Sequence, residues 1–347
     1  MTTVKLVQTV LGVVPHDTLG TVDYHDHLFH SSPILPGDEI CDEAASAAEA
    51  GALRASGFSA MIDATPIGLG RRPEALARIS AATGLAVVAA TGLHRQAHYL
   101  ADDPILGIDV AKMAAVFERE LMVGQLGDDA ELRSGRPVDE LTVALGPSGT
   151  PVLAGLVKTG IDYWRISPFE RTVLEAAALA HGRTDAPIMV HLEYCTAAHE
   201  VLDLLASAGV HESRVVLAHA DRDPDPGLHL ELTSRGAYLG YDGMARPKGV
   251  SEAVLLELTQ RVVEGGGGQR LLLGADVARR SRYVAYGGMP GLAYLGRRYL
   301  PRLRHCLADA AIELILVTNP ARLLASPRHA NDLVSQTAPA SGTSVRS

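Results

Sequence analysis

Two histidines that lie two residues apart near the start of the chain are the first candidates for metal chemistry. They are His25 and His27, in the stretch TVDYHDHLFH over residues 21–30. Residues i and i+2 of a β-strand point to the same side, so the two imidazoles would face one ligand together. Neutral imidazole is a common ligand of divalent transition metals. The pair alone is equally consistent with two hydrogen-bonded histidines of a protein core.

Four further residues that bind metals or transfer protons lie at the ends of apolar, strand-like segments. They are Lys158, His191, His219 and Asp276. In a barrel of parallel strands surrounded by helices, catalytic groups lie at the C-terminal ends of the strands. Together with the histidine pair, five different strand ends carry such a residue, which predicts that His25 and His27 form half of one metal site.

The elements that must position these residues form eight repeats of a strand followed by a helical segment. Strands are expected at 21–27, 59–65, 85–92, 151–158, 187–191, 214–219, 237–242 and 270–276. Amphipathic helices are expected at 42–57 and 167–182, the second with Ser167 and Glu170 as a capping box and Gly182 as its end. Continuous apolar strands indicate a parallel sheet, and eight of them close a (β/α)8 barrel. An open doubly wound sheet is the alternative, but no GxGxxG motif follows the first strand.

The composition restricts the class of protein and its partners. The chain has 347 residues, a net charge of −9 and no long basic block, which disfavours nucleic-acid binding. No apolar run reaches membrane-spanning length, and the opening residues lack the pattern of a secretory signal. The three scattered cysteines fit reduced thiols, so we expect a cytoplasmic protein. We expect one barrel domain over 1–325 and a flexible tail over 326–347.

An ordered set of short motifs makes the chain resemble the phosphotriesterase family of the amidohydrolase superfamily over about residues 10–325. The motifs are HDH, AGLVKTG, VHLE, LAHAD, GAD and TNPARLLA. This resemblance implies that His25, His27 and Asp276 bind one metal ion and that His191 and His219 bind a second. It also implies that Lys158 is carboxylated and bridges the two ions. Zinc is the expected metal, with manganese or cobalt as alternatives.

The expected pair of adjacent metal ions indicates a hydrolytic mechanism. A water between them has a strongly lowered pKa and attacks as hydroxide. The resemblance makes Asp276 both a metal ligand and the proton shuttle to the leaving group. Asp221, two residues after His219, either orients a ligand as an outer carboxylate or caps a loop or helix.

The loops after the seventh and eighth strands are rich in cations. We expect Arg246, Lys248, Arg279, Arg280 and Tyr286 to bind substrate, with Arg282 nearby. Cations at this place in an acidic chain indicate an anionic small molecule, although each could instead pair with a local carboxylate. Tyr163 and Trp164, just after Lys158, either wall the pocket or pack at the entry of a helix.

The same loops favour some substrates over others. An organophosphate pocket would be aromatic, whereas this chain has one Trp and four Phe. The branch that cleaves acyl-homoserine lactones tends to have a tyrosine where this chain has His94. We therefore expect hydrolysis of a lactone or carboxylic ester of a small anionic substrate, such as a sugar lactone, by a homodimer. The alternatives are an amide or phosphotriester hydrolase, a metal-dependent nuclease, or a metal-bearing barrel that binds a ligand without turnover.

Overall fold

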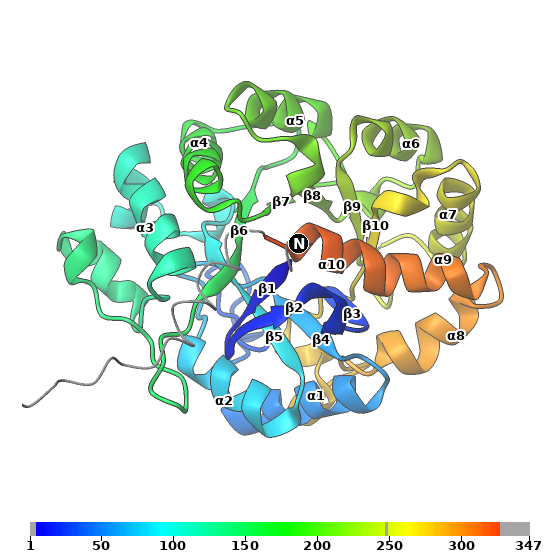
Figure 1. The fold of residues 1–347 in the computed structure, drawn as a ribbon, viewed down its shortest axis with the longest axis horizontal. Helices are drawn as coiled ribbons and strands as arrows, with labels where there is room; N and C mark the ends of the chain where they lie inside the picture. Colours follow the sequence, from blue (N-terminus) through cyan, green and yellow to red (C-terminus); the bar gives the residue numbers. More distant parts are fainter. Residues whose placement is uncertain (1–4, 247–248, 327–347) are drawn as a thin grey trace, which may run out of the picture.

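The computed structural model describes residues 5–246 and 249–326, and its centre is a barrel of eight parallel strands (Figure 1). The strands are β3 (Val22–Asp26), β4 (Ala60–Asp63), β5 (Ala86–Gly92), β6 (Ala154–Gly160), β7 (Ile188–His191), β8 (Val215–Ala218), β9 (Tyr238–Tyr241) and β10 (Leu271–Leu273). The N–H of Asp276 donates to the carbonyl oxygen of His25 at 2.9 Å, which joins the segment after β10 to β3. The predicted (β/α)8 barrel is confirmed, and each of the eight predicted strand segments overlaps one of these strands.

Helices form a ring around these strands, as Figure 1 shows. Those that follow the first seven strands are α1 (Glu43–Ala55), α2 (Pro73–Thr83), α3 (Val110–Met122), α4 (Pro168–Thr184), α5 (Ala198–Ser207), α6 (Pro226–Arg235) and α7 (Glu252–Glu264). After β10 come α8 (Leu300–Leu303), α9 (Asp309–Glu313) and α10 (Asn319–Leu324), with π-helical turns at Leu295–Tyr299 and Leu314–Thr318. Strand and helix therefore alternate from β3 to α7.

Helix α4 begins as predicted but ends later than predicted. The Ser167 side chain accepts from the Glu170 N–H at 3.2 Å, and the Glu170 side chain accepts from the Ser167 N–H at 2.8 Å. The helix does not end at Gly182 but continues to Thr184, so that prediction was wrong. Asp185 ends it instead, because this residue adopts the left-handed conformation at φ 60° and donates its N–H to the His181 carbonyl.

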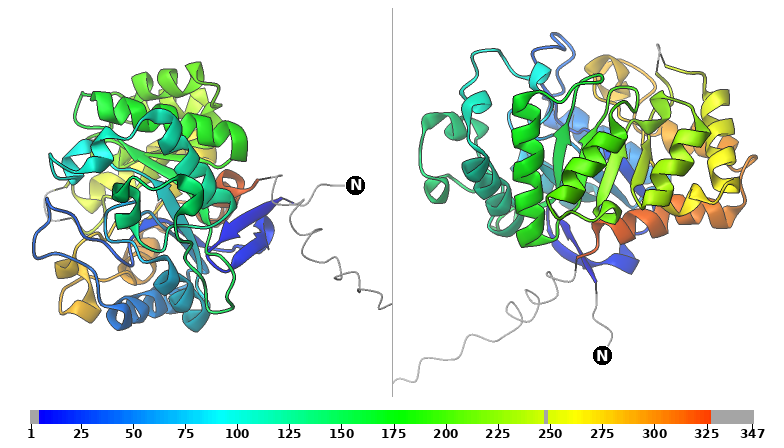
Figure 2. Two further views of the ribbon diagram at one scale, coloured as in Figure 1. Left: turned by 90° about the vertical axis from the view of Figure 1, so that its left-hand side faces the viewer. Right: turned by 90° about the horizontal axis from the view of Figure 1, so that it is seen from above.

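A hairpin that the sequence analysis did not anticipate covers one end of the barrel. It consists of β1 (Leu6–Thr9) and β2 (Gly12–Pro15), which pair in antiparallel fashion. The N–H of Val10 donates to the carbonyl oxygen of Val87 at 2.9 Å, which ties the hairpin to β5. Figure 2 shows the hairpin at the end of the barrel opposite the long loops. The open end is therefore the one formed by the C-terminal ends of the strands.

The apolar residues of the strands separate into two layers. One cluster packs against the helices, and the other consists mostly of residues of the barrel strands and fills the barrel. Leu156 of β6 and Met189 of β7 belong to the interior cluster. Because alternate strand residues share a face, Lys158 and His191 lie directly beyond them on the same side. Packing of the interior layer thus directs both functional side chains into the open end.

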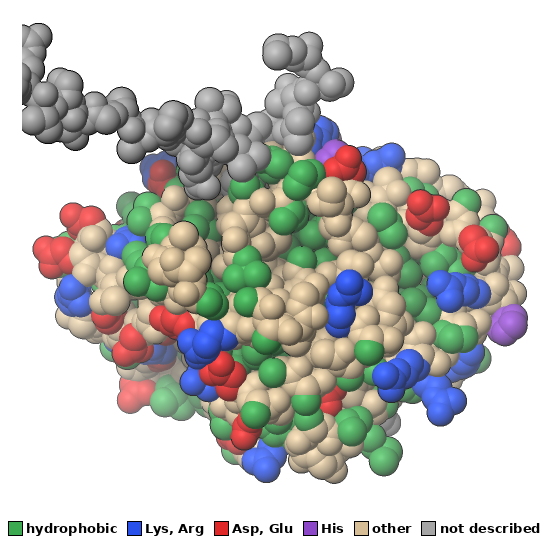
Figure 3. Space-filling view, turned by 60° about the horizontal axis from the view of Figure 1, so that its bottom comes forward, with side chains coloured by type: hydrophobic (Ala, Val, Ile, Leu, Met, Phe, Trp, Pro, Cys, Tyr) green, Lys and Arg blue, Asp and Glu red, His purple; other side chains and the backbone are tan. Residues whose placement is uncertain are grey.

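Other features bear on the domain and partner predictions. No helix among the described residues is long and apolar enough to cross a membrane. Ser326 pairs with Leu6 through the backbone, and the rest of the predicted tail lies outside the described residues. On the face drawn in Figure 3, basic and acidic side chains are both scattered over the surface. The predicted cytoplasmic location, the tail and the homodimer stay predictions.

Candidate active site

All six predicted metal ligands lie buried at the open end of the barrel. None has more than 6% of its surface exposed: His25, His27, Lys158, His191, His219 and Asp276. Five strands or their following residues supply them, namely those of β3, β6, β7, β8 and β10. The sequence separations are large, so only barrel closure brings these side chains together.

The first group of ligand atoms comes from the first and last strands of the barrel, β3 and β10, and the residues that follow them. The Nε2 atoms of His25 and His27 lie 3.8 and 3.4 Å from Oδ1 of Asp276. These three residues offer ligand atoms close enough to hold one metal ion. The other ring nitrogen of His27, Nδ1, contacts the Thr65 hydroxyl at 2.7 Å, which fixes the ring orientation. The structure therefore brings together the residues predicted to bind the first ion.

The second group comes from β7 and β8. Nε2 of His219 lies 2.9 Å from Nδ1 of His191, so these two nitrogens point at each other. The other ring nitrogen of each histidine contacts a carboxylate. His191 Nε2 lies 2.9 Å from Glu193, and His219 Nδ1 lies 2.6 Å from Asp242. Each imidazole thus has one nitrogen held by an acid and the other turned toward the site, the arrangement typical of metal-binding histidines.

Lys158 lies against His25 of the first group, but it is not at the end of its strand. The prediction that its strand ends at residue 158 was wrong, because β6 continues to Gly160, which pairs with His191. The amine Nζ lies 3.4 Å from His25 Nε2 and 3.2 Å from Met189 Sδ. Burial lowers the pKa of Lys158 to about 7, against the opposing effect of Asp242. A substantial share of this amine is therefore neutral near pH 7.

The protonation states of the histidines fit a metal centre. Burial lowers the pKa of His27 to about 3, and it lowers the pKa of His25, His191 and His219 well below the usual value. Metal ions bind the neutral form of imidazole. Four neutral imidazoles and the Asp276 carboxylate form a mixed nitrogen and oxygen set that suits divalent transition metals. The residues present therefore fit the divalent metal centre.

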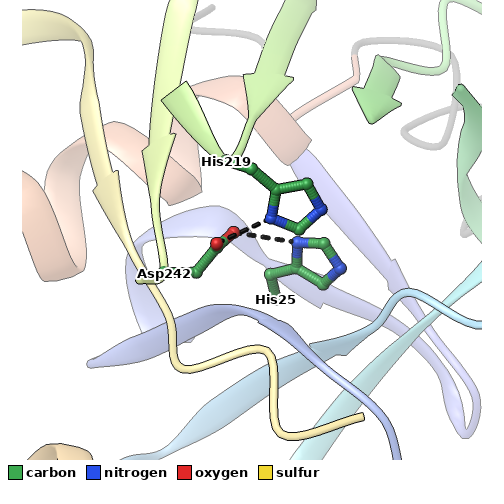
Figure 4. Close-up of side chains that lie close together, drawn as sticks. All are labelled: His25, His219 and Asp242. Atoms are coloured by element: carbon green, nitrogen blue, oxygen red, sulfur yellow. Dashed lines mark hydrogen bonds and ion pairs between the residues drawn. The ribbon is translucent and has the colours of Figure 1, made fainter. Parts of the chain in front are cut away.

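Asp242 is a central carboxylate that the sequence analysis missed. It follows β9 and lies between His25 and His219, as Figure 4 shows. Its Oδ2 lies 3.2 Å from His25 Nδ1, and its Oδ1 lies 2.6 Å from His219 Nδ1. The Tyr24 hydroxyl donates a further short hydrogen bond to it. The two histidines hold the pKa of Asp242 well below its usual value, despite burial, so one ionised carboxylate orients a ligand from each group.

Three arginines hold Asp276. Arg246 pairs closely with Oδ2 and donates to the Asp276 carbonyl oxygen at 3.2 Å, and Arg282 donates to the same oxygen at 3.1 Å. Arg222 reaches Oδ2 at 3.5 Å. Asp276 has a φ of 45°, a strained backbone conformation for a residue with a side chain. The arginines therefore stabilise a conformation in which Oδ1 faces the histidines.

A cavity of about 560 Å³ opens beside this centre. Its walls include Asp221, Arg222, Arg246, Arg279 and Arg282. Of the predicted substrate-binding residues, Arg246 and Arg279 are therefore brought to the cavity. Arg279 is half-exposed and lies 3.4 Å from Asp38. Lys248 lies outside the described residues.

Two predicted substrate-binding residues are engaged elsewhere. The Tyr286 hydroxyl accepts from the Asp42 N–H at 2.8 Å and lies 3.0 Å from the Ser46 hydroxyl, at the start of α1. The Arg280 guanidinium lies 5.8 Å from the centre of the Tyr286 ring. Neither residue lines the cavity beside the metal ligands. These contacts attach the loop after β10 to α1.

Three other residues singled out from the sequence have defined places. Asp221 accepts from the N–H groups of Asp242 and Gly243 at 3.0 and 2.7 Å, so it fixes the loop after β9 instead of orienting a ligand directly. The ring of His94 lies 4.5 Å from that of His191 and packs against the metal centre. Tyr163 lines a separate cavity beyond Arg222.

The residues that the sequence analysis missed carried detectable signals. Asp242 is the last residue of the predicted seventh strand, so the rule applied to the other strand ends would have found it. Glu193 and Arg222 follow His191 and His219 by two and three residues. Their roles depend on how the loops fold, since Arg222 reaches Asp276 and lies 3.6 Å from Glu193.

Fold and site together define a barrel hydrolase with a divalent metal centre. The profile of the Phosphotriesterase family matches residues 5–136 and 136–324. The chain therefore belongs to the phosphotriesterase family, as its motifs indicated.

Named relatives span most of this chain. A phosphotriesterase homology protein of Mycobacterium tuberculosis is 29% identical, covering 91% of this chain and 97% of the relative. A phospho-furanose lactonase of Mycoplasmopsis synoviae is 29% identical, with 92% of each chain covered. An N-acetyltaurine hydrolase of Danio rerio is 26% identical, covering 92% of this chain and 97% of the relative.

Solved structures show the same fold. An amidohydrolase from Mycoplasma synoviae has a TM-score of 0.84 at 26% identity, with 97% of this chain and 98% of the other covered. A lactonase from Listeria monocytogenes has a TM-score of 0.79 at 25% identity, with 92% and 98% covered. The similarity extends over the barrel as a whole.

Proposed function

We propose that this protein is a metal-dependent lactonase that hydrolyses a small anionic lactone, such as a sugar lactone. The observation that carries the proposal is the convergence of buried, neutral histidines and Asp276 beside a cavity lined by arginines. The named lactonases among its relatives support the same reaction. One of them acts on a phosphorylated furanose lactone, by its name, which agrees with an anionic substrate.

We assign the ligands of two divalent ions, with zinc as the expected metal. His25, His27 and Asp276 would hold the first ion, and His191 and His219 the second. Lys158 would join them as a carbamate, because its lowered pKa leaves neutral amine to react with carbon dioxide. Bound ions would supply Lewis acidity, which activates a water as nucleophile and polarises the carbonyl of the lactone.

The side chains around the centre then have distinct tasks. Asp276 takes a proton from the attacking water and passes it to the departing ring oxygen. Asp242 holds the orientation of His25 and His219 through its two oxygens. Arg246 and Arg279 attract the anionic group of the substrate into the cavity.

The proposal is tested with purified, zinc-loaded protein and a panel of lactones, esters, amides and phosphotriesters, with and without a phosphate or carboxylate group. We expect about two metal ions per chain and fastest turnover of an anionic lactone. Fastest turnover of an N-acyl amide would favour the reaction in the name of the Danio rerio relative. A metal-loaded protein that turns over no member of the panel would contradict the proposal and favour a ligand-binding barrel.

The carbamate has its own test. Lys158→Met should lose most of the metal and the activity, since a thioether cannot supply the bridging oxygens. Added short carboxylic acids should restore part of both by replacing the carbamate. Full metal content and rate in Lys158→Met would show that Lys158 is not the bridge.

A further inference from the structure

An aromatic shelf lies next to the active site and has no part in the chemistry described above. Tyr163 and Trp164 follow β6, and Tyr194 follows β7. They are 58%, 64% and 54% exposed, and the rings of Tyr163 and Tyr194 meet edge to face at 6.2 Å. Among the described residues, every other tyrosine and phenylalanine is buried or half-buried. The exposed aromatic surface of the described chain is therefore concentrated at one place on the rim.

The backbone holds this shelf in a fixed shape. Trp164 and Tyr194 have φ angles of 46° and 54°, which are strained for residues with side chains. The Trp164 N–H donates to the Thr196 hydroxyl at 3.0 Å, and that hydroxyl donates to the Glu193 carbonyl at 2.7 Å. Thr196 therefore ties the two loops together. Strained residues of this kind cluster at ligand-binding sites, and here two of them carry exposed aromatic rings.

The shelf borders a second cavity, which shares lining residues with the cavity beside the metal ligands. This cavity has a volume of about 670 Å³, within the usual range for small-molecule sites. Tyr194 and Arg222 line both this cavity and the one beside Asp276. The Arg222 guanidinium also contacts Asp276, so one side chain touches both the cavity beside the shelf and the reacting centre. A substrate that reaches past Arg222 would place its far end on the aromatic rings.

We propose that Tyr163, Trp164 and Tyr194 form a second subsite that binds a sugar ring at the far end of the substrate. The proposal rests on the proposed lactonase function and extends it to a substrate of two linked parts. Flat aromatic faces pack against the C–H faces of a sugar ring. Glu200 and Asp223 line the same cavity and offer carboxylates to sugar hydroxyl groups. This mixture of aromatic and acidic groups suits a hydroxylated ring better than a purely apolar one.

Trp164 is the only tryptophan in the chain, so its fluorescence reports on the shelf directly. Zinc-loaded protein is titrated with methyl β-D-glucopyranoside and, separately, with benzyl alcohol. We expect a saturable blue shift with the glucoside, because the sugar ring removes water from an indole that is 64% exposed. Tyr194→Ala should weaken the glucoside by about two- to tenfold, the usual worth of one aromatic contact. Leu11→Ala, an exposed apolar control on the hairpin, should bind like wild type.

A second measurement links the shelf to catalysis. Cellobionolactone carries one glucose ring more than gluconolactone, and the wild type should have the lower KM for cellobionolactone. Tyr194→Ala should reduce this preference by the same factor as it weakens the glucoside.

The absence of a saturable spectral change, an unchanged glucoside affinity in Tyr194→Ala, or tighter binding of benzyl alcohol would each overturn the sugar subsite. Hydrolysis of simple lactones without any spectral change would refute the subsite and leave the proposed function standing. Saturable glucoside binding without turnover of any lactone would refute the proposed function and leave the subsite standing.

Discussion

The base of the active site and its mouth are held by different means. The base, around His25, His219 and Asp242, consists of buried residues at strand ends whose polar atoms contact one another. The mouth, formed by the loops after β9 and β10, carries arginines that are partly exposed and paired with acids, as Arg279 is with Asp38. The strands fix the backbone positions of the residues in the base, whereas the loops of the mouth are more mobile and can change their contacts more easily. We therefore expect substitutions in the base to affect chemistry and metal binding, and those in the mouth to affect substrate binding.

The largest effect is expected from Asp276→Asn, which tests whether the base performs chemistry. Asparagine keeps the shape and one oxygen for a metal but cannot accept a proton. We expect metal content close to wild type and a kcat lower by about 10²–10⁴, the usual contribution of an acid–base group. Elemental analysis and steady-state kinetics on the best lactone measure both. Equal rates in the two proteins would remove Asp276 from the mechanism.

Asp242→Asn tests whether the base depends on its central carboxylate. An amide cannot accept hydrogen bonds from His25 and His219 with both of its polar atoms, so one imidazole loses its orientation. Loss of such an outer carboxylate usually costs about 10- to 100-fold in metal affinity or activity. Metal affinity is measured by competition with a chelator, and Asp223→Asn serves as a control for the loss of one nearby charge. Unchanged affinity would mean that Asp242 is not needed to position the ligands.

The same contrast explains how much the sequence could predict. His191 and His219 were correctly predicted to lie in the site from their positions at the ends of apolar strands. In a closed parallel barrel, the C-terminal ends of all strands lie at the same end of the barrel. Asp242 obeys the same rule and was overlooked, so its position was predictable in principle. Arg222 was not, because its contact with Asp276 depends on a loop in which His219 adopts a left-handed conformation.

Element boundaries failed for a related reason. Gly182 matched a helix end by type, yet Asp185 takes the capping conformation three residues later. Lys158 lies two residues inside β6 because the pairing with β7 extends the strand beyond its apolar run. In both cases, contacts with the rest of the molecule decide a boundary that local residue types leave open.

Substitution of two arginines of the mouth tests which of them affects only substrate binding and which also affects the chemistry of the base. Arg279→Ala should raise KM by about tenfold and leave kcat and metal content unchanged, as expected for loss of one charge-assisted hydrogen bond to substrate. Arg246→Ala should raise KM similarly but also lower kcat, because Arg246 contacts the Asp276 carboxylate directly. Kinetics on one anionic lactone and its uncharged analogue separate the two effects. An unchanged KM in both variants would show that neither arginine binds the anionic group.

The smallest effect is expected from Tyr286→Phe, which examines whether the outer part of the mouth is structural. The Tyr286 hydroxyl forms hydrogen bonds with the Asp42 backbone and the Ser46 hydroxyl. Phenylalanine has no hydroxyl, so in the variant those groups would form hydrogen bonds with water instead. We expect the free energy of unfolding to fall by about 1 kcal/mol, the net worth of such a hydrogen bond. Because Tyr286 does not line the cavity beside the metal ligands, KM should stay close to wild type. Chemical denaturation and steady-state kinetics measure the two quantities, with Tyr163→Phe as a stability control at an exposed position. A raised KM at unchanged stability would instead move Tyr286 into the substrate site and extend the functional mouth to α1.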